Sequence, residues 1–325
     1  MRKRTKPYSL LNMAFIFILS NCYFKTSLYI YLFTMNQLFS STGLKHIIVT
    51  DTEKEVNFNV LVQYPTLSEP HIEHIGPYDF QGLKDASIAE GMFPLILISH
   101  GNSGSHLIYR SITTELAKNG CIVAMIEHYG NNRNDNHLGE SLENLVLRPK
   151  HCSLTINSLL SSDFKDSIDS DKIGIIGHSF GGYTALALAG GKPYTKEGDM
   201  VDVKKDKRIK TIVLMAPAAA FFMRPHSLCE VDIPIQVFIA EKDEFIPPVF
   251  SADTILSKEI HNREKLDIHI IENAGHFAFI TPFPEHMNSP QFLPSTDPSG
   301  FNRSEFHQSL PHTIKEFLFS HLYEL

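Results

Sequence analysis

The sequence predicts an open, doubly wound α/β domain built on a mostly parallel sheet. Short, continuous apolar runs alternate along the chain with helical patterns, which is typical of parallel strands covered by helices on both faces. The chain has 325 residues, of which 43% are hydrophobic and 20% are charged. This composition is sufficient for one large hydrophobic core and is not that of a disordered chain.

Two strands of a different kind precede the alternating part, at residues 44–50 and 55–64. The second of them alternates Val and Phe with more polar residues, which indicates a half-buried antiparallel strand. The turn-like residues 51–54 join the two, so we expect an antiparallel N-terminal edge. Residues 66–92 contain Pro, Gly and His with little periodicity, and we expect them to form a loop.

The remaining elements bring the sheet to about eight strands. Further strands are expected at 94–98, 121–127, 173–176, 211–216, 236–240 and 266–271, and helices at 107–119, 141–162, 183–189 and 304–322. Pro149 predicts a kink or break in the second helix. Residues 281–300, rich in Pro and Phe, form an insertion before the last helix, and residues 190–210 are too few for a large lid domain.

The most informative motif is the run Gly177-His178-Ser179-Phe180-Gly181, placed between a predicted strand and a predicted helix. A serine hydroxyl needs a base to become a nucleophile at neutral pH. A tight strand-to-helix turn, the nucleophile elbow, lifts that hydroxyl clear of the sheet and requires small residues on both sides, here Gly177 and Gly181. The pentapeptide also fits an ordinary glycine-rich turn, so its interpretation depends on finding catalytic partners.

Candidate partners follow two later strands. Functional side chains of open α/β sheets gather at the carboxyl ends of the strands. Asp243 lies three residues past the strand at 236–240 and is the candidate acid, with Glu241 and Glu244 as alternatives. His276 follows the last strand and is the candidate base, which completes the order Ser, Asp, His expected for this architecture.

These residues predict acyl transfer. His276 would take the proton from Ser179 and later protonate the leaving group, while Asp243 orients the imidazole and water resolves an acyl-enzyme on Ser179. The oxyanion of the tetrahedral intermediate needs preorganised donors. We expect the backbone N–H groups of Phe180 and Asn102 to supply them.

The loop at 99–104 and the elbow each carry one further histidine. We expect His100 and His178 to make structural hydrogen bonds beneath the loop and the elbow, and neither is expected to act as the base.

Several motifs together resemble one family. They are His100-Gly101, Glu127-His128, Arg148-Pro149, the elbow run, Gly275-His276-Phe277 and the tail at 297–307. This set is similar to the serine-type branch of dienelactone-hydrolase-like proteins, which includes bacterial relatives of platelet-activating-factor acetylhydrolase. The resemblance covers about residues 43–320. Dienelactone hydrolase itself uses a cysteine where this chain has Ser179, so lactone specificity is not implied.

The resemblance implies an α/β-hydrolase fold and hydrolysis of carboxylic esters without a cofactor. It carries Ser179, Asp243 and His276 over as the triad, with Asn102 and Phe180 as oxyanion donors. A thioesterase or amide hydrolase with the same triad is the alternative, and a non-catalytic binding protein is a second one.

The ends of two strands suggest where an acyl group would bind. The apolar residues 216–223 and 277–280 are predicted to line an acyl pocket or, alternatively, to be ordinary core. Because residues 190–210 are so few, we expect an open site that favours short to medium acyl chains.

Composition limits the possible partners. The formal net charge is −7, which is not expected of a nucleic-acid-binding protein. The cysteines form no disulfide framework, and no metal-binding motif is present. Together with the resemblance, these features imply a small-molecule ester as the partner and neither a metal nor a cofactor; the sequence does not indicate the oligomeric state.

Residues 1–35 differ from the rest. Basic residues at 2–6 are followed by an apolar run at 10–24, the layout of an export signal. This leader is expected to be a signal, a membrane anchor, or an upstream extension of a protein that starts at Met35. The protein would be exported or anchored in the first two cases and cytoplasmic in the third, with membrane contact only through residues 1–35. Residues 43–325 are expected to form a single α/β-hydrolase domain.

Overall fold

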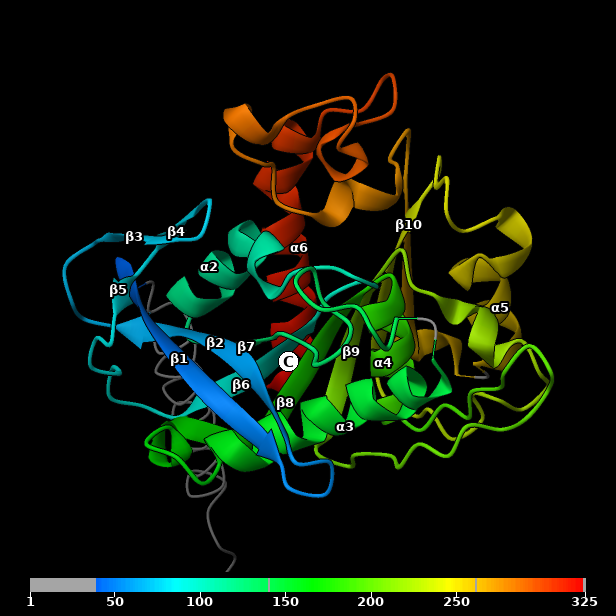
Figure 1. Ribbon diagram of the computed structural model, residues 1–325, viewed down its shortest axis with the longest axis horizontal. Helices are drawn as coiled ribbons and strands as arrows, with labels where there is room; N and C mark the ends of the chain where they lie inside the picture. Colours follow the sequence, from blue (N-terminus) through cyan, green and yellow to red (C-terminus); the bar gives the residue numbers. More distant parts are fainter. Residues whose placement is uncertain (1–38, 140, 261, 324–325) are drawn as a thin grey trace, which may run out of the picture. The chain divides into compact units, whose positions relative to one another are not determined.

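The computed structural model of the protein describes residues 39–139, 141–260 and 262–323. Within these ranges a nine-stranded sheet has the order β11-β10-β9-β8-β6-β7-β2-β1-β5 (Figure 1). Its strands are β1 (Ser41–Asp51), β2 (Val56–Thr66), β5 (Leu83–Lys84), β6 (Phe93–Ser99), β7 (Ile122–Ile126), β8 (Ile168–His178), β9 (Ile209–Met215), β10 (Ile235–Ala240) and β11 (Leu266–Ile271).

The six strands from β6 to β11 are parallel, and they are the six that the apolar runs predicted. The strands β1 and β2 pair with each other in antiparallel register, and β2 pairs antiparallel with β7, as the alternating pattern predicted. The predicted class, a mostly parallel α/β sheet with an antiparallel N-terminal edge, is therefore confirmed.

The prediction of a loop over residues 66–92 is wrong in part. This segment holds the hairpin of β3 (Ile72–Ile75) and β4 (Tyr78–Gln81), and also β5, which extends the sheet beside β1. These strands have only two to four residues, too few to show a hydrophobic period in the sequence. Tyr78 and Phe80 alternate with exposed residues, so β4 is held by burying one face.

Helices cover both faces of the sheet (Figure 1). The helices α3 (Leu142–Leu159), α4 (Phe180–Leu188) and α5 (Ala252–Glu259) pack into one hydrophobic core, and α2 (Arg110–Lys118) and α6 (Arg303–Leu322) pack into the other. Strand β6 contributes side chains to both cores, because Leu95 and Leu97 face the first while Ile96 and Ile98 face the second. Helix α5 was not predicted.

Helix α3 continues through Pro149, so the predicted break does not occur. Proline lacks the N–H that would bond to the carbonyl of Leu145, four residues earlier. The hydroxyl of Tyr183, on α4, donates to that carbonyl at 2.9 Å, and both residues are buried. A neighbouring helix thus replaces the missing bond.

The predicted leader, residues 1–35, lies outside the described residues, and its separation from a single following domain stays a prediction. Of the helices in the described ranges, none has the length and apolar character needed to cross a membrane.

We expect Tyr183→Phe to lower the free energy of unfolding by about 1 to 3 kcal/mol, because it leaves the buried Leu145 carbonyl unpaired. In a Pro149→Ala background the cost should shrink, since an alanine at this position restores the N–H within the helix. Urea unfolding followed by far-UV circular dichroism suits a chain without tryptophan. An equal cost in both backgrounds would contradict this role of Tyr183.

Candidate active site

Ser179 lies in the turn between β8 and α4, with φ 54° and ψ −117°. The turn is possible because its neighbours are glycines: a Cβ on Gly177 would lie 2.2 Å from the carbonyl oxygen of Gly181, and one on Gly181 would lie 1.8 Å from that of Ser99. The N–H of Ser179 donates to the carbonyl of Met215 at 2.9 Å, which ties the turn to β9.

The three predicted side chains meet at the carboxyl edge of the sheet. The Ser179 hydroxyl lies 2.9 Å from Nε2 of His276, and Nδ1 of His276 lies 2.9 Å from Oδ2 of Asp243. His276 is 5% exposed, so this row of hydrogen bonds is largely shielded from water.

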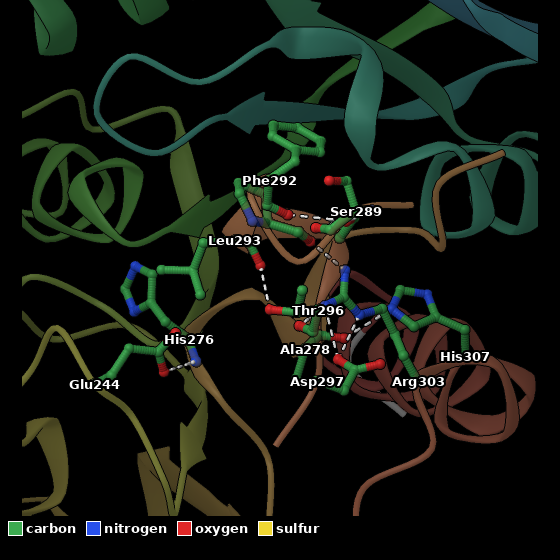
Figure 2. Close-up of polar contacts among 12 residues, drawn as sticks. Glu244, His276, Ala278, Ser289, Phe292, Leu293, Thr296, Asp297, Arg303 and His307 are labelled. Atoms are coloured by element: carbon green, nitrogen blue, oxygen red, sulfur yellow. Dashed lines mark hydrogen bonds and ion pairs between the residues drawn. The ribbon is translucent and has the colours of Figure 1, made fainter. Parts of the chain in front are cut away.

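The three acidic residues after β10 have different partners. The Asp243 carboxylate bonds the imidazole and also accepts from the N–H groups of Phe245 and Ile246, at 2.9 Å each. Glu241 accepts from the N–H of Asn273 at 2.8 Å. Glu244 accepts from the backbone N–H of His276 at 3.2 Å (Figure 2). The two alternatives to Asp243 therefore hold the backbone around His276 and do not bond its ring.

The two predicted oxyanion donors border the same space as Ser179. Phe180 is the first residue of α4, and Asn102 lies in the loop after β6. Neither N–H donates a hydrogen bond within the part of the chain that the structure describes. The Asn102 side chain accepts from Nδ2 of Asn131 at 2.7 Å, which fixes the loop.

A cavity of about 1020 Å³ opens over Ser179. Its wall includes the aromatic rings Phe180, Phe221, Phe245, Phe277, Phe283 and Phe292. Of the two segments predicted to line an acyl pocket, Phe221 and Phe277 face the cavity, whereas Phe222 is core. Residues 190–210 add only the short stretch 195–197 to the wall among the described residues.

The insertion after β11 supplies one side of this cavity, a role that the sequence analysis did not predict. Arg303, at the start of α6, donates to the carbonyls of Pro294 and Thr296, at 2.7 Å each, and to Oδ1 of Asp297 (Figure 2). These bonds hold Phe292 and Pro294 at the cavity wall. The only available signal was the presence of Phe283 and Phe292 in this insertion.

Several buried histidines surround the site. His178 donates from Nε2 to the His276 carbonyl at 3.0 Å and accepts from the Tyr109 hydroxyl, and His100 donates from Nδ1 to the Gly101 carbonyl at 2.7 Å. Both thus make the structural bonds that were expected of them. Burial lowers the pKa of His178 to about 3 and that of His100 well below its usual value, so both rings are neutral.

No group of three metal-ligating side chains occurs within residues 39–139, 141–260 and 262–323.

Comparison with known proteins agrees with the fold. A model of the family described as alpha/beta hydrolase fold matches residues 94–228. A solved structure, a ferulic acid esterase from Streptomyces cinnamoneus, superposes with a TM-score of 0.66 at 16% identity, over 88% of this chain and 91% of that one. The protein has the α/β-hydrolase fold.

A comparison with curated proteins finds sequence similarity to one kind of enzyme. Over a matched segment of 138 residues, the chain is 33% identical to the platelet-activating factor acetylhydrolases of Canis lupus familiaris and Bos taurus, and over 135 residues it is 31% identical to that of Cavia porcellus. Each match covers 29% of this chain and 31% of the relative, so it spans less than a third of these proteins. The resemblance to the acetylhydrolase branch that the motifs predicted is thereby confirmed.

The buried histidines predict how stability depends on pH. Burial lowers the pKa of His151 to about 3, whereas the unfolded chain protonates near the ordinary value of about 6.5. The unfolded state therefore binds more protons below about pH 6.5, and stability should fall as the pH drops from about 7 to about 5.

Replacing His151 by Phe should remove about 1 to 2 kcal/mol of that fall, measured by urea unfolding at both pH values. The exposed Ser309, changed to Ala, is the control and should leave the pH dependence as it is, because serine does not titrate in this range. An unchanged pH dependence in the His151 variant would refute the explanation.

Proposed function

We propose that this protein is a serine hydrolase that cleaves carboxylic esters through an acyl-enzyme on Ser179. One observation carries the proposal: a hydroxyl, an imidazole and a carboxylate from three distant parts of the chain form one row with 2.9 Å contacts. Such a row is the arrangement in which serine becomes a nucleophile.

The proposed mechanism gives each group one step. Nε2 of His276 takes the Ser179 proton as Oγ attacks the ester carbonyl carbon. The N–H groups of Phe180 and Asn102 then stabilise the oxyanion. His276 gives its proton to the departing alcohol, and a water molecule, activated by the same nitrogen, releases the acid and restores Ser179. Asp243 keeps Nδ1 protonated and stabilises the imidazolium.

Substrate preference is proposed from the cavity and the relatives. The relatives are named acetylhydrolases, and the similar solved structure is named an esterase. The aromatic wall suits an apolar acyl or aryl group. The insertion that Arg303 holds bounds one side of the cavity, and residues 190–210 add only 195–197 to its wall, so this stretch forms no large lid over it. Short to medium acyl chains are therefore the proposed substrates, and an acetylhydrolase-like activity is included.

Ser179→Ala and His276→Ala should each lower kcat/KM for p-nitrophenyl acetate by about 10⁴-fold or more, because the residues of a triad act as one unit. Ser309→Ala and His286→Ala, at exposed positions, are the matched controls and should stay near wild type. If a folded Ser179→Ala protein kept most of its activity, the assignment would fail.

A series of p-nitrophenyl esters tests the preference for chain length. We expect kcat/KM to be highest for short to medium acyl groups and to decline beyond about twelve carbons, because residues 190–210 add only 195–197 to the cavity wall and form no large lid over a longer chain. A rate that rises steadily with longer chains would contradict the proposed substrate class while leaving the triad intact.

A further inference from the structure

Arg148, on α3, is an unusual buried residue. Its side chain is the largest of the fully buried ones in the described part of the chain. Nε donates to the Thr184 hydroxyl at 3.3 Å, Nη1 to Oδ1 of Asn131 at 2.7 Å, and Nη2 to the Ser99 hydroxyl at 3.3 Å and to the His100 carbonyl. All four acceptors are neutral, and over the described ranges no carboxylate forms an ion pair with Arg148.

A buried charge without an opposite partner is costly, and apolar residues of similar volume often stabilise a fold better. The neighbouring histidines do not compensate the charge: burial and the Arg148 guanidinium lower the pKa of His100 and His128 well below the usual range, so both are neutral. Burial lowers the pKa of Arg148 itself to about 9, which still leaves it protonated at neutral pH. Fold stability alone therefore does not account for this guanidinium.

The contacts of Arg148 converge on both predicted oxyanion donors. Through Asn131, whose Nδ2 donates to Oδ1 of Asn102 at 2.7 Å, it holds the loop after β6. The guanidinium also lies 5.0 Å from the centre of the Phe180 ring, and its partner Thr184 donates to the Phe180 carbonyl at 3.2 Å. One side chain thus touches, directly or through one residue, both sides of the oxyanion hole.

We propose that Arg148 is a positioning residue that fixes both oxyanion donors and places an uncompensated positive charge beside them. This inference rests on the proposed function. A charge without a neutralising partner acts strongly across a protein interior of low dielectric constant. It would stabilise the oxyanion of the transition state more than the neutral ester, so its effect belongs on kcat and not on KM.

The test compares Arg148→Met and Arg148→Lys in the full chain, with p-nitrophenyl acetate as substrate. We expect Arg148→Met to lower kcat about 100-fold, as loss of an oxyanion donor does, with KM within about threefold of wild type. Arg148→Lys keeps the charge but not the fork of donors, and should lose about tenfold.

An alkyl trifluoromethyl ketone, which forms a tetrahedral adduct with an active serine, supplies a readout that a purely structural role would not move. Its affinity should fall in parallel with kcat/KM across the two variants, because both report on the oxyanion. If Arg148→Met does not fold, the variants Arg148→Lys and Asn131→Ala test the proposal instead. Each is expected to lower kcat about tenfold.

Arg208→Met is the matched control. Arg208 also bonds α3, through Ser153 and Asn157, but its charge is paired with Asp206. We expect Arg208→Met to lower the free energy of unfolding without changing kcat. The proposal is overturned if a folded Arg148→Met protein keeps kcat and the inhibitor affinity, or if its loss lies in KM alone. If the wild type hydrolyses no ester, the proposed function fails instead.

Discussion

The strained backbone of Ser179 is the constraint on which the rest of the site depends. A non-glycine residue at φ 54° costs about 1 to 3 kcal/mol unless its surroundings hold it there. Here Gly177 lets the two arms of the turn touch, and Gly181 lets the turn approach Ser99 of β6. The N–H of Ser179 bonds the Met215 carbonyl of β9, and the Ser179 carbonyl accepts from the N–H of Gly182 in α4. Helix α4 must then start directly after the hydroxyl, which leaves the N–H of Phe180 free at its N-terminus.

Sheet order decides how the imidazole reaches this serine. Strand β8 is separated from β11 by β9 and β10, so the loop carrying His276 must turn back across the carboxyl ends of two strands. Acidic side chains after β10 guide that return: Glu241 and Glu244 hold its backbone, while Asp243 bonds the ring. The amide of Lys242 adds a bond to the Ala274 carbonyl at 2.8 Å. The three acidic residues thus hold the same loop: two bond its backbone, and the third bonds the imidazole ring.

The features that could be predicted from the sequence are those that depend on residues close together in the chain. Continuous apolar runs predicted the parallel strands, and the positions just past three of them predicted Ser179, Asp243 and His276, which the fold brings together. The strands β3 and β4 are too short to show an alternating hydrophobic pattern in the sequence. The continuity of α3 at Pro149 depends on Tyr183, and the cavity wall near Phe292 depends on Arg303; both are long-range contacts without a local signature. Arg148 was noticed as part of a motif, but its contacts with two distant loops could not be foreseen.

The central claim is that the Ser179 hydroxyl is the activated nucleophile. The most direct measurement is reaction of the wild-type protein with a fluorophosphonate, followed by digestion and mass spectrometry to locate the adduct. The account predicts a single phosphonylated residue, Ser179, with labelling much slower when His276 is replaced by Ala. An adduct on another serine, or no adduct on protein that actively hydrolyses esters, would contradict it.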